Sequence, residues 1–248
     1  MLLTPKHRSA LNERGFSLLE MVIALGLLMV VLGVAVDGIS QMMRRNTSEN
    51  GKVDTVQETR DFVDQMVRDI HDVGFPPSRL INGAPTCVGN ANISCGLVAY
   101  SPTAIQYEGD LDGSGTVYEV YMQLLVPASG NCPCTLQRGV VTKAQALAGT
   151  LPTYFTEVNG VLNSGNGAGA ATYPIVLPGG GTYTTYGTAD VFDAYDTNAA
   201  AVATCTTAVT CSSIRSLQIT ANVVPNYMDT KTTTFPVYSI TSKARLNN

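Results

Sequence analysis

The feature that most constrains the fold of this chain is an apolar run at residues 16–36 whose one charged side chain is Glu20. As a helix rising ~1.5 Å per residue, the run is about 31 Å long, which is just enough to cross a bilayer. A carboxylate in such a helix costs roughly 2.5–3.5 kcal/mol to insert. We therefore expect Glu20 to have a partner or a function.

A short basic leader, residues 1–15, precedes the run and contains Lys6, Arg8 and Arg14 against one acid, Glu13. The remaining residues hold twelve basic and eighteen acidic side chains. The positive-inside rule predicts a cytoplasmic leader, a single inner-membrane span and an extracytoplasmic C-terminal domain. The acidic part has no basic patch, which argues against direct binding of nucleic acid.

Helical periodicity continues beyond the apolar run. Apolar side chains recur on one helix face through residues 53–73, and Gly-Phe-Pro-Pro at 74–77 is a strong stop signal. The sequence therefore predicts one long helix over about 16–73, with residues 46–51 as the place where it could loosen. Its second half is expected to pack on a domain.

After residue 77 the apolar period changes to two, which is typical of half-buried strands. The alternating segments are 118–126, 217–223 and 238–241, with shorter ones at 104–107, 135–141 and 175–177. The predicted fold class is α+β, a long N-terminal helix packed on an antiparallel β-sheet domain. The predicted division is a leader at 1–15, a transmembrane part at 16–36, an amphipathic continuation at 37–75, and a β-rich domain at 76–248 with a long surface loop at 159–187.

The cysteines all lie in the predicted extracytoplasmic part: Cys87, Cys95, Cys132, Cys134, Cys205 and Cys211. An even number in an oxidising compartment suggests disulfides, and the simplest local loops are Cys87–Cys95 and Cys205–Cys211. Cys132 and Cys134 flank a single proline, so a bridge between them is expected to be strained. Zinc is the competing interpretation, but the sequence has no CxxC pair and no nearby histidine.

The most specific motif is Gly-Phe-Ser-Leu-Leu-Glu at residues 15–20. The simpler interpretation is a secretory signal peptide, with a small-residue cleavage site at Gly33-Val34-Ala35. Signal peptides rarely carry a Glu in the apolar region, and cleavage after Ala35 would remove the start of the long helix. Both points favour another kind of N-terminal segment.

The stretch GFSLLEMVIALGLLMVV resembles the type IV pilin family, which includes type II secretion pseudopilins and minor pilins. The resemblance implies that a prepilin peptidase cuts between Gly15 and Phe16 on the cytoplasmic side and methylates the new N-terminus, Phe16. It also implies that Glu20 pairs with the N-terminal amine of a neighbouring subunit during assembly, which would offset two desolvation costs together. Position 37 is Asp, where major pilins usually have a helix-kinking proline, so a minor pilin or pseudopilin is expected.

Two further segments are similar to J-type pseudopilins and W-type minor pilins. They are AIQYEGDLDGSGTVYEVYMQLL, followed by TLQRG at 135–139, and the ending IRSLQITANVV…VYSITSKARLNN. This similarity implies a priming or tip subunit of a type IV pilus or type II secretion pseudopilus. Its partners would be other pilins, minor pilins or pseudopilins, bound through the N-terminal helix. An anchored extracytoplasmic binding protein or adhesin stays open as the alternative.

A short acidic segment, DLDGSG at residues 110–115, raises the question of a metal. Asp110, Asp112 and Ser114 have the spacing of the first half of an EF-hand calcium loop. The twelfth position counted from Asp110 is Tyr121 rather than the bidentate Glu of an EF-hand. The alternative is a polar β-turn shaped by Asp and Gly. Calcium is the one cofactor that the sequence suggests.

Catalytic patterns such as GxSxG, HExxH and the P-loop do not occur in the sequence. Of the two histidines, His7 lies in the predicted leader and His71 on the predicted exposed side of the long helix. We therefore predict a structural subunit, and not an enzyme, that is itself the substrate of the peptidase.

Overall fold

The computed structural model describes residues 17–80, 86–128, 131–163, 177, 186, 189–229, 232 and 234–246. The chain divides into two compact units, one ending at Asn46 and the other beginning at Thr47. Gly15 and Phe16 lie outside the described residues, as does most of the predicted 159–187 loop.

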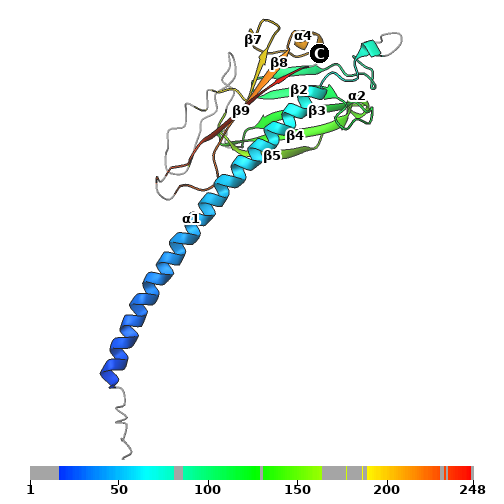
Figure 1. The fold of residues 1–248 in the computed structure, drawn as a ribbon. Helices are drawn as coiled ribbons and strands as arrows, with labels where there is room; N and C mark the ends of the chain where they lie inside the picture. The colour runs from blue at the N-terminus through cyan, green and yellow to red at the C-terminus, as the bar shows by residue number, and fades with distance from the viewer. Residues whose placement is uncertain are drawn as a thin grey trace, which may run out of the picture. The chain divides into compact units, whose positions relative to one another are not determined.

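Helix α1 spans Leu18–Asp72, close to the predicted bounds (Figure 1). It continues without interruption through residues 46–51, where the sequence suggested loosening. In this stretch Ser48 Oγ donates to the carbonyl oxygen of Met228, and Lys52 Nζ donates to Asp229 Oδ2. A Cβ at Gly51 would lie 2.8 Å from the ring of Tyr227. Gly51 weakens the helix locally, but its lack of a side chain leaves room for the Tyr227 ring to pack there.

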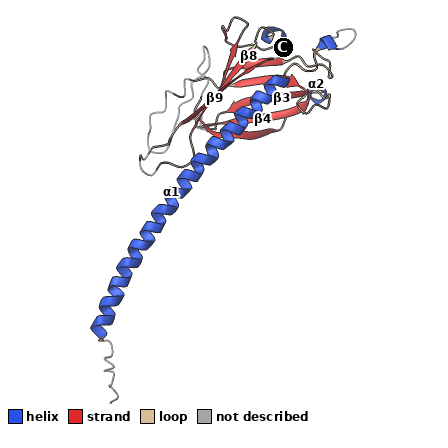
Figure 2. Ribbon diagram, in the orientation of Figure 1, coloured by secondary structure: helices blue, strands red, loops and turns tan. Residues whose placement is uncertain are grey.

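The second half of α1 buries one face in the core of the unit that begins at Thr47. The buried side chains recur every three or four residues, and they are Thr59, Phe62, Val63, Met66, Asp69 and Ile70. They belong to the same core cluster as Tyr107, Val120, Leu136 and Val158 of the sheet. Figure 2 shows this part of the helix lying against the strands. The opposite face, which includes His71, is exposed.

The strands form one antiparallel sheet. They are β1 (Leu97–Ser101), β2 (Ala104–Gly109), β3 (Tyr118–Leu125), β4 (Cys134–Thr142), β5 (Tyr154–Val161), β6 (Phe192–Tyr195), β7 (Ala201–Val202), β8 (Ser216–Val223) and β9 (Tyr238–Arg245). Their order is β1-β2-β3-β4-β5-β8-β6-β7, and β9 pairs with β8. Three short helical segments complete the described elements: η1 (Ser78–Leu80), α2 (Lys143–Leu147) and α4 (Ala208–Cys211). The predicted α+β class, a long N-terminal helix packed on an antiparallel sheet, is confirmed.

Five of the six predicted strands are present, as β2, β3, β4, β8 and β9. The sixth, at 175–177, lies outside the described residues apart from Leu177, which is in no strand. Strands β1, β5, β6 and β7 were not predicted from the sequence. The predicted loop at 159–187 starts too early, because β5 extends to Val161. Gly160 lies inside this strand with a φ of +71°. A glycine within a strand is unusual, so this part of the sequence resembles a loop.

Candidate functional site

The first unit presents an apolar helix surface. Every Leu, Ile, Val and Met from Leu18 to Met43 in α1 is at least 53% exposed. A continuous apolar surface of this kind requires lipid or partner helices to cover it. Among the described residues, α1 is the one helix that is long and apolar enough to cross a membrane.

Glu20 lies in the first turn of α1, at one end of this surface. Its Oε2 accepts a hydrogen bond from the backbone N–H of Ser17 at 3.1 Å. A carboxylate at this position satisfies one of the free N–H groups of the first turn and is stabilised by the helix dipole. The side chain is exposed, so it remains accessible to a cation from another molecule.

Two glycines give the apolar surface a place for close approach. Gly26 and Gly33 are seven residues apart, which is two helical turns, and a Cβ at either would have no atom within 4 Å. Small residues at this spacing let a neighbouring helix backbone come near. The part of α1 in the first unit therefore has the surface of a helix that packs against other helices or lies in lipid.

A buried ion pair fixes the second half of α1 to the sheet. Asp69 Oδ2 accepts hydrogen bonds from the Tyr107 hydroxyl and from Arg138 Nη2, each at 2.8 Å. Burial, together with the neighbouring Asp69 carboxylate, raises the pKa of the Tyr107 hydroxyl well above its usual value. The network joins α1 to β2 and β4, and sequence analysis missed it because its members are distant along the chain.

The cysteines form three disulfides, and no free cysteine remains among the described residues. The pairs are Cys87–Cys95, Cys132–Cys134 and Cys205–Cys211, with Cα–Cα distances of 5.1, 4.4 and 5.3 Å. The first and third are the local loops expected from the sequence. The second joins the residues for which a strained bridge was expected, and its Cα–Cα distance lies at the short end of the usual range. With their sulfurs paired, these cysteines are not available as zinc ligands.

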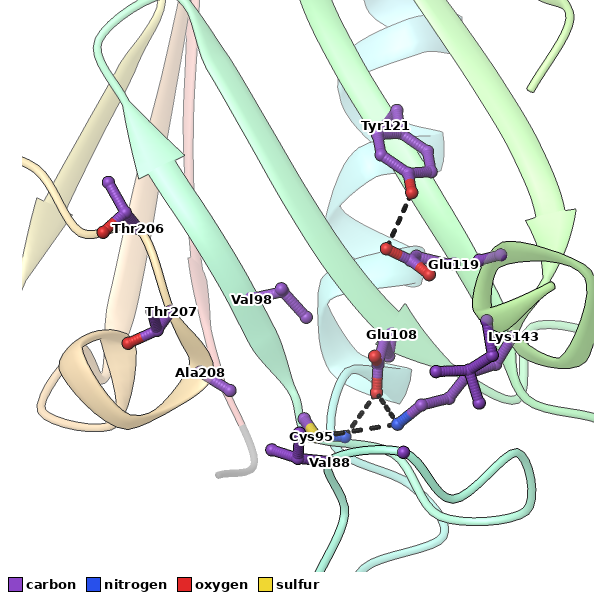
Figure 3. A pocket seen from close by; sticks show the side chains of 13 residues that line it. Val88, Cys95, Val98, Glu108, Glu119, Tyr121, Lys143, Thr206, Thr207 and Ala208 are labelled. Carbon is purple, nitrogen blue, oxygen red and sulfur yellow. Dashed lines mark hydrogen bonds and ion pairs between the residues drawn. The ribbon is translucent and has the colours of Figure 1, made fainter. Parts of the chain in front are cut away.

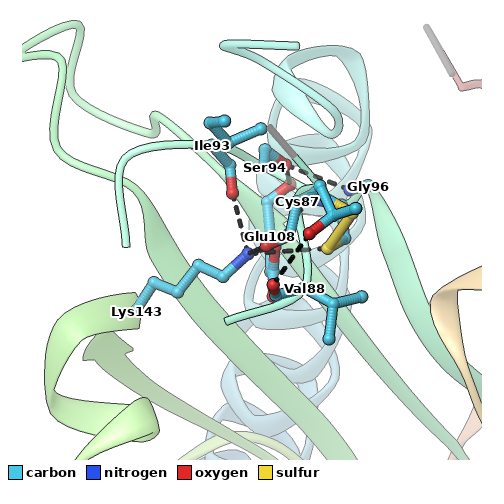
Figure 4. Close-up of a disulfide and its surroundings, with 9 residues drawn as sticks. Cys87, Val88, Ile93, Ser94, Gly96, Glu108 and Lys143 are labelled. Atoms are coloured by element: carbon cyan, nitrogen blue, oxygen red, sulfur yellow. Dashed lines mark hydrogen bonds and ion pairs between the residues drawn. A yellow bond between two sulfur atoms is a disulfide. The ribbon is translucent and has the colours of Figure 1, made fainter. Parts of the chain in front are cut away.

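Lys143, the first residue of α2, fastens the Cys87–Cys95 loop to the sheet (Figure 4). It is 2% exposed, and its Nζ donates to the carbonyl oxygens of Cys87 and Ile93 at 2.8 and 2.7 Å and to Glu108 Oε2 at 2.6 Å. Three oxygen acceptors satisfy the three N–H bonds of the ammonium group, and Cys95 Sγ lies 3.5 Å from Nζ as well. Burial raises the pKa of Glu108, although its bonds to Lys143 and to the Cys95 N–H act in the opposite direction. This arrangement is a structural clamp.

A pocket of about 370 Å³ opens beside this clamp (Figure 3). Its polar lining includes Glu119, whose Oε1 accepts hydrogen bonds from the Tyr121 hydroxyl at 2.8 Å and from Gln106 Nε2. Burial and the neighbouring Glu119 raise the pKa of the Tyr121 hydroxyl. These polar groups are bonded to one another, so the arrangement is that of a packed sheet surface rather than of a nucleophile beside a base.

The three residues suggested as calcium ligands lie together in the turn between β2 and β3. Asp110 Oδ2 accepts the N–H of Gly115 at 2.8 Å, and Asp112 Oδ1 accepts the N–H of Ser114 at 3.0 Å. Among the described residues, no group of three or more His, Cys, Asp or Glu side chains is placed to hold a metal ion. The turn is thus not a full EF-hand.

Comparison with known families identifies the N-terminal segment. Residues 11–36 match the prokaryotic N-terminal methylation motif. This match supports the type IV pilin family and the cleavage and methylation that its prepilins undergo. It includes Gly15, Phe16 and Glu20 and ends where the apolar run ends. No curated protein and no solved structure matches the chain.

Proposed function

We propose that this protein is a minor pilin or pseudopilin. Prepilin peptidase cuts the precursor between Gly15 and Phe16 and methylates Phe16, and α1 then packs with the helices of other subunits in a type IV pilus or type II secretion pseudopilus. The observation that carries the proposal is the methylation motif at residues 11–36 on the start of a helix with an exposed apolar surface. The chain performs no chemistry of its own.

Glu20 is the residue through which one subunit engages the next. Its carboxylate sits in the first turn of α1, and Glu20 is the fifth residue of a mature chain that begins at Phe16. The amine that pairs with it exists only after the cut at Gly15. Pairing the carboxylate of one subunit with the amine of its neighbour removes two unpaired charges from the lipid at once.

A specialised subunit, rather than the bulk filament protein, is favoured by the sequence at residue 37. Asp37 replaces the proline that major pilins usually have, and its Oδ2 accepts a hydrogen bond from Gln41 Nε2 at 3.0 Å within an unbroken helix. The large β domain and its similarity to the W-type and J-type group fit a priming or tip position. Head-to-tail packing of such helices builds open filaments.

Substituting Glu20→Ala tests the proposal in cells. We expect cleavage and methylation to continue, because the peptidase acts before subunits pair, while the amount in sheared filaments falls at least tenfold, or about 1.4 kcal/mol. Asp37→Ala is the matched control, since it removes an acid from the same helix at the far end of the apolar run. Normal incorporation of the Glu20→Ala protein would contradict this role for Glu20. Absence of the unsubstituted protein from sheared filaments would instead favour an anchored adhesin that does not assemble.

A further inference from the structure

The turn between β2 and β3 contains a carboxylate oxygen that has no partner. Asp110 is 7% exposed, and its Oδ1 is buried without a hydrogen bond to any described residue. Its other oxygen, Oδ2, is held inside the turn by the Gly115 N–H, and its own N–H donates to the carbonyl oxygen of Phe75 at 3.0 Å. A buried carboxyl oxygen without a donor or cation is costly, so its position calls for a ligand.

The backbone around Asp110 has the form of the first part of a calcium loop. Counted from Asp110, the sixth residue is Gly115, with a φ of +82°. The sixth position of an EF-hand loop is a glycine that makes the sharp turn. Asp110, Asp112 and Ser114 occupy the first, third and fifth positions, which supply side-chain oxygen ligands in such loops.

Asp112 brings a second carboxylate to the same turn. Besides the Ser114 N–H, it accepts a hydrogen bond from the Tyr118 hydroxyl to Oδ2 at 2.9 Å. Asp110 and Asp112 therefore bring two carboxyl groups to one turn.

We propose that this turn binds Ca²⁺ through Asp110 Oδ1 and the Asp112 carboxylate. The oxygen-only donor set suits a hard cation, and Ca²⁺ tolerates the irregular geometry that Mg²⁺ does not. Ser114, backbone carbonyl oxygens and water complete the coordination. Because Tyr121 stands where an EF-hand has its bidentate Glu, the affinity falls in the range of extracellular modules, with a Kd on the order of 10⁻⁴–10⁻³ M.

Bound calcium would stabilise the junction between α1 and the sheet. The segment after α1 pairs with the end of β2 through the bridge Val73–Gly109, and Asp110 continues this pairing through its N–H bond to Phe75. An ion held by Asp110 therefore fastens the β2–β3 turn next to the end of the helix. Its effect is on stability, independent of the role proposed for Glu20.

The test is thermal unfolding of the full chain in detergent micelles, in 10 mM CaCl₂ and in EGTA. We expect Ca²⁺ to raise the Tm of the unsubstituted protein by about 3–10 °C, with a smaller effect of Mg²⁺. The rise should be lost in Asp110→Asn and in Asp112→Asn; the latter changes an exposed side chain and should fold normally. Asp196→Asn is the matched control, because Asp196 Oδ1 accepts two turn N–H groups at 2.8 Å. The Asp196→Asn protein should keep the rise in Tm on addition of Ca²⁺.

Terbium luminescence gives a second measurement of the same site. The chain has no tryptophan, so tyrosine must sensitise bound Tb³⁺, and the Tyr118 hydroxyl already contacts Asp112. Excitation of tyrosine should give Tb³⁺ emission that Ca²⁺ displaces and that both turn variants lose. Absence of a Ca²⁺ effect on the unsubstituted protein, an equal effect of Mg²⁺, or an effect retained in Asp110→Asn would each overturn the proposal.

Discussion

Glu20 and Asp69 are acids on the same helix in opposite situations. Glu20 is exposed and accepts a hydrogen bond from the N–H of Ser17, whereas Asp69 is 9% exposed and accepts hydrogen bonds from Tyr107 and Arg138. A buried carboxylate with two donors from two strands holds a helix in place, while an exposed one at a helix start is free to bind another molecule. Asp69 therefore serves internal packing, and Glu20 has the exposure that its proposed role in assembly requires.

Substituting Asp69→Asn should destabilise the domain. The Arg138 guanidinium would lose its charged partner while its Nε is already buried without a hydrogen bond to any described residue. We expect a loss of roughly 2–4 kcal/mol in the free energy of unfolding, measured by chemical denaturation of the full chain in detergent. Asp64→Asn on the exposed face of the same helix should change it by less than about 0.5 kcal/mol. Equal effects of the two would show that the ion pair contributes no stability.

The sequence revealed Glu20 but not Asp69 or Lys143, for a physical reason. Glu20 belongs to a local sequence motif of about twenty residues, which can be recognised without knowledge of the fold. Asp69 meets Arg138 across 69 positions, and Lys143 meets Glu108 across 35, so neither pair leaves a local pattern. Long-range pairing of charges depends on strand order, which periodicity alone does not give.

At the scale of the elements, β3 and β8 were predicted from the alternation of their apolar residues, whereas the irregular strand β5 was not predicted. Strand β3 has apolar residues at alternate positions from Tyr118 to Leu124 and pairs in register with both β2 and β4. Strand β5 has irregular pairing with β4 and meets β8 through a single residue pair, Val161–Val223. Its sequence reflects a junction between two parts of the sheet rather than a uniform half-buried strand.

Gly160 is the residue that permits this junction. Its φ is +71°, and a Cβ there would lie 2.2 Å from the carbonyl oxygen of Val224. Gly160→Ala should therefore cost roughly 1–2 kcal/mol for the backbone conformation and more for the clash. Gly149→Ala separates the two effects, since Gly149 has a φ of +82° with no atom within 4 Å. Denaturation midpoints should fall clearly further for Gly160→Ala; similar midpoints would mean that the close approach is not required.

At the scale of the whole molecule, the two units have different solvent requirements. The unit that ends at Asn46 exposes apolar side chains along α1, and the unit that begins at Thr47 has its own core and three disulfides. The first requires lipid or other helices, and the second requires an oxidising compartment. A precursor inserted in a membrane and later packed through its helix meets both requirements.

The central claim, that this chain is processed as a prepilin, is tested most directly by mass spectrometry of the mature protein from its native host. We predict a protein that lacks residues 1–15 and begins at Phe16 carrying one added methyl group on its amine. An intact leader, or an N-terminus created by cleavage after Ala35, would contradict the account.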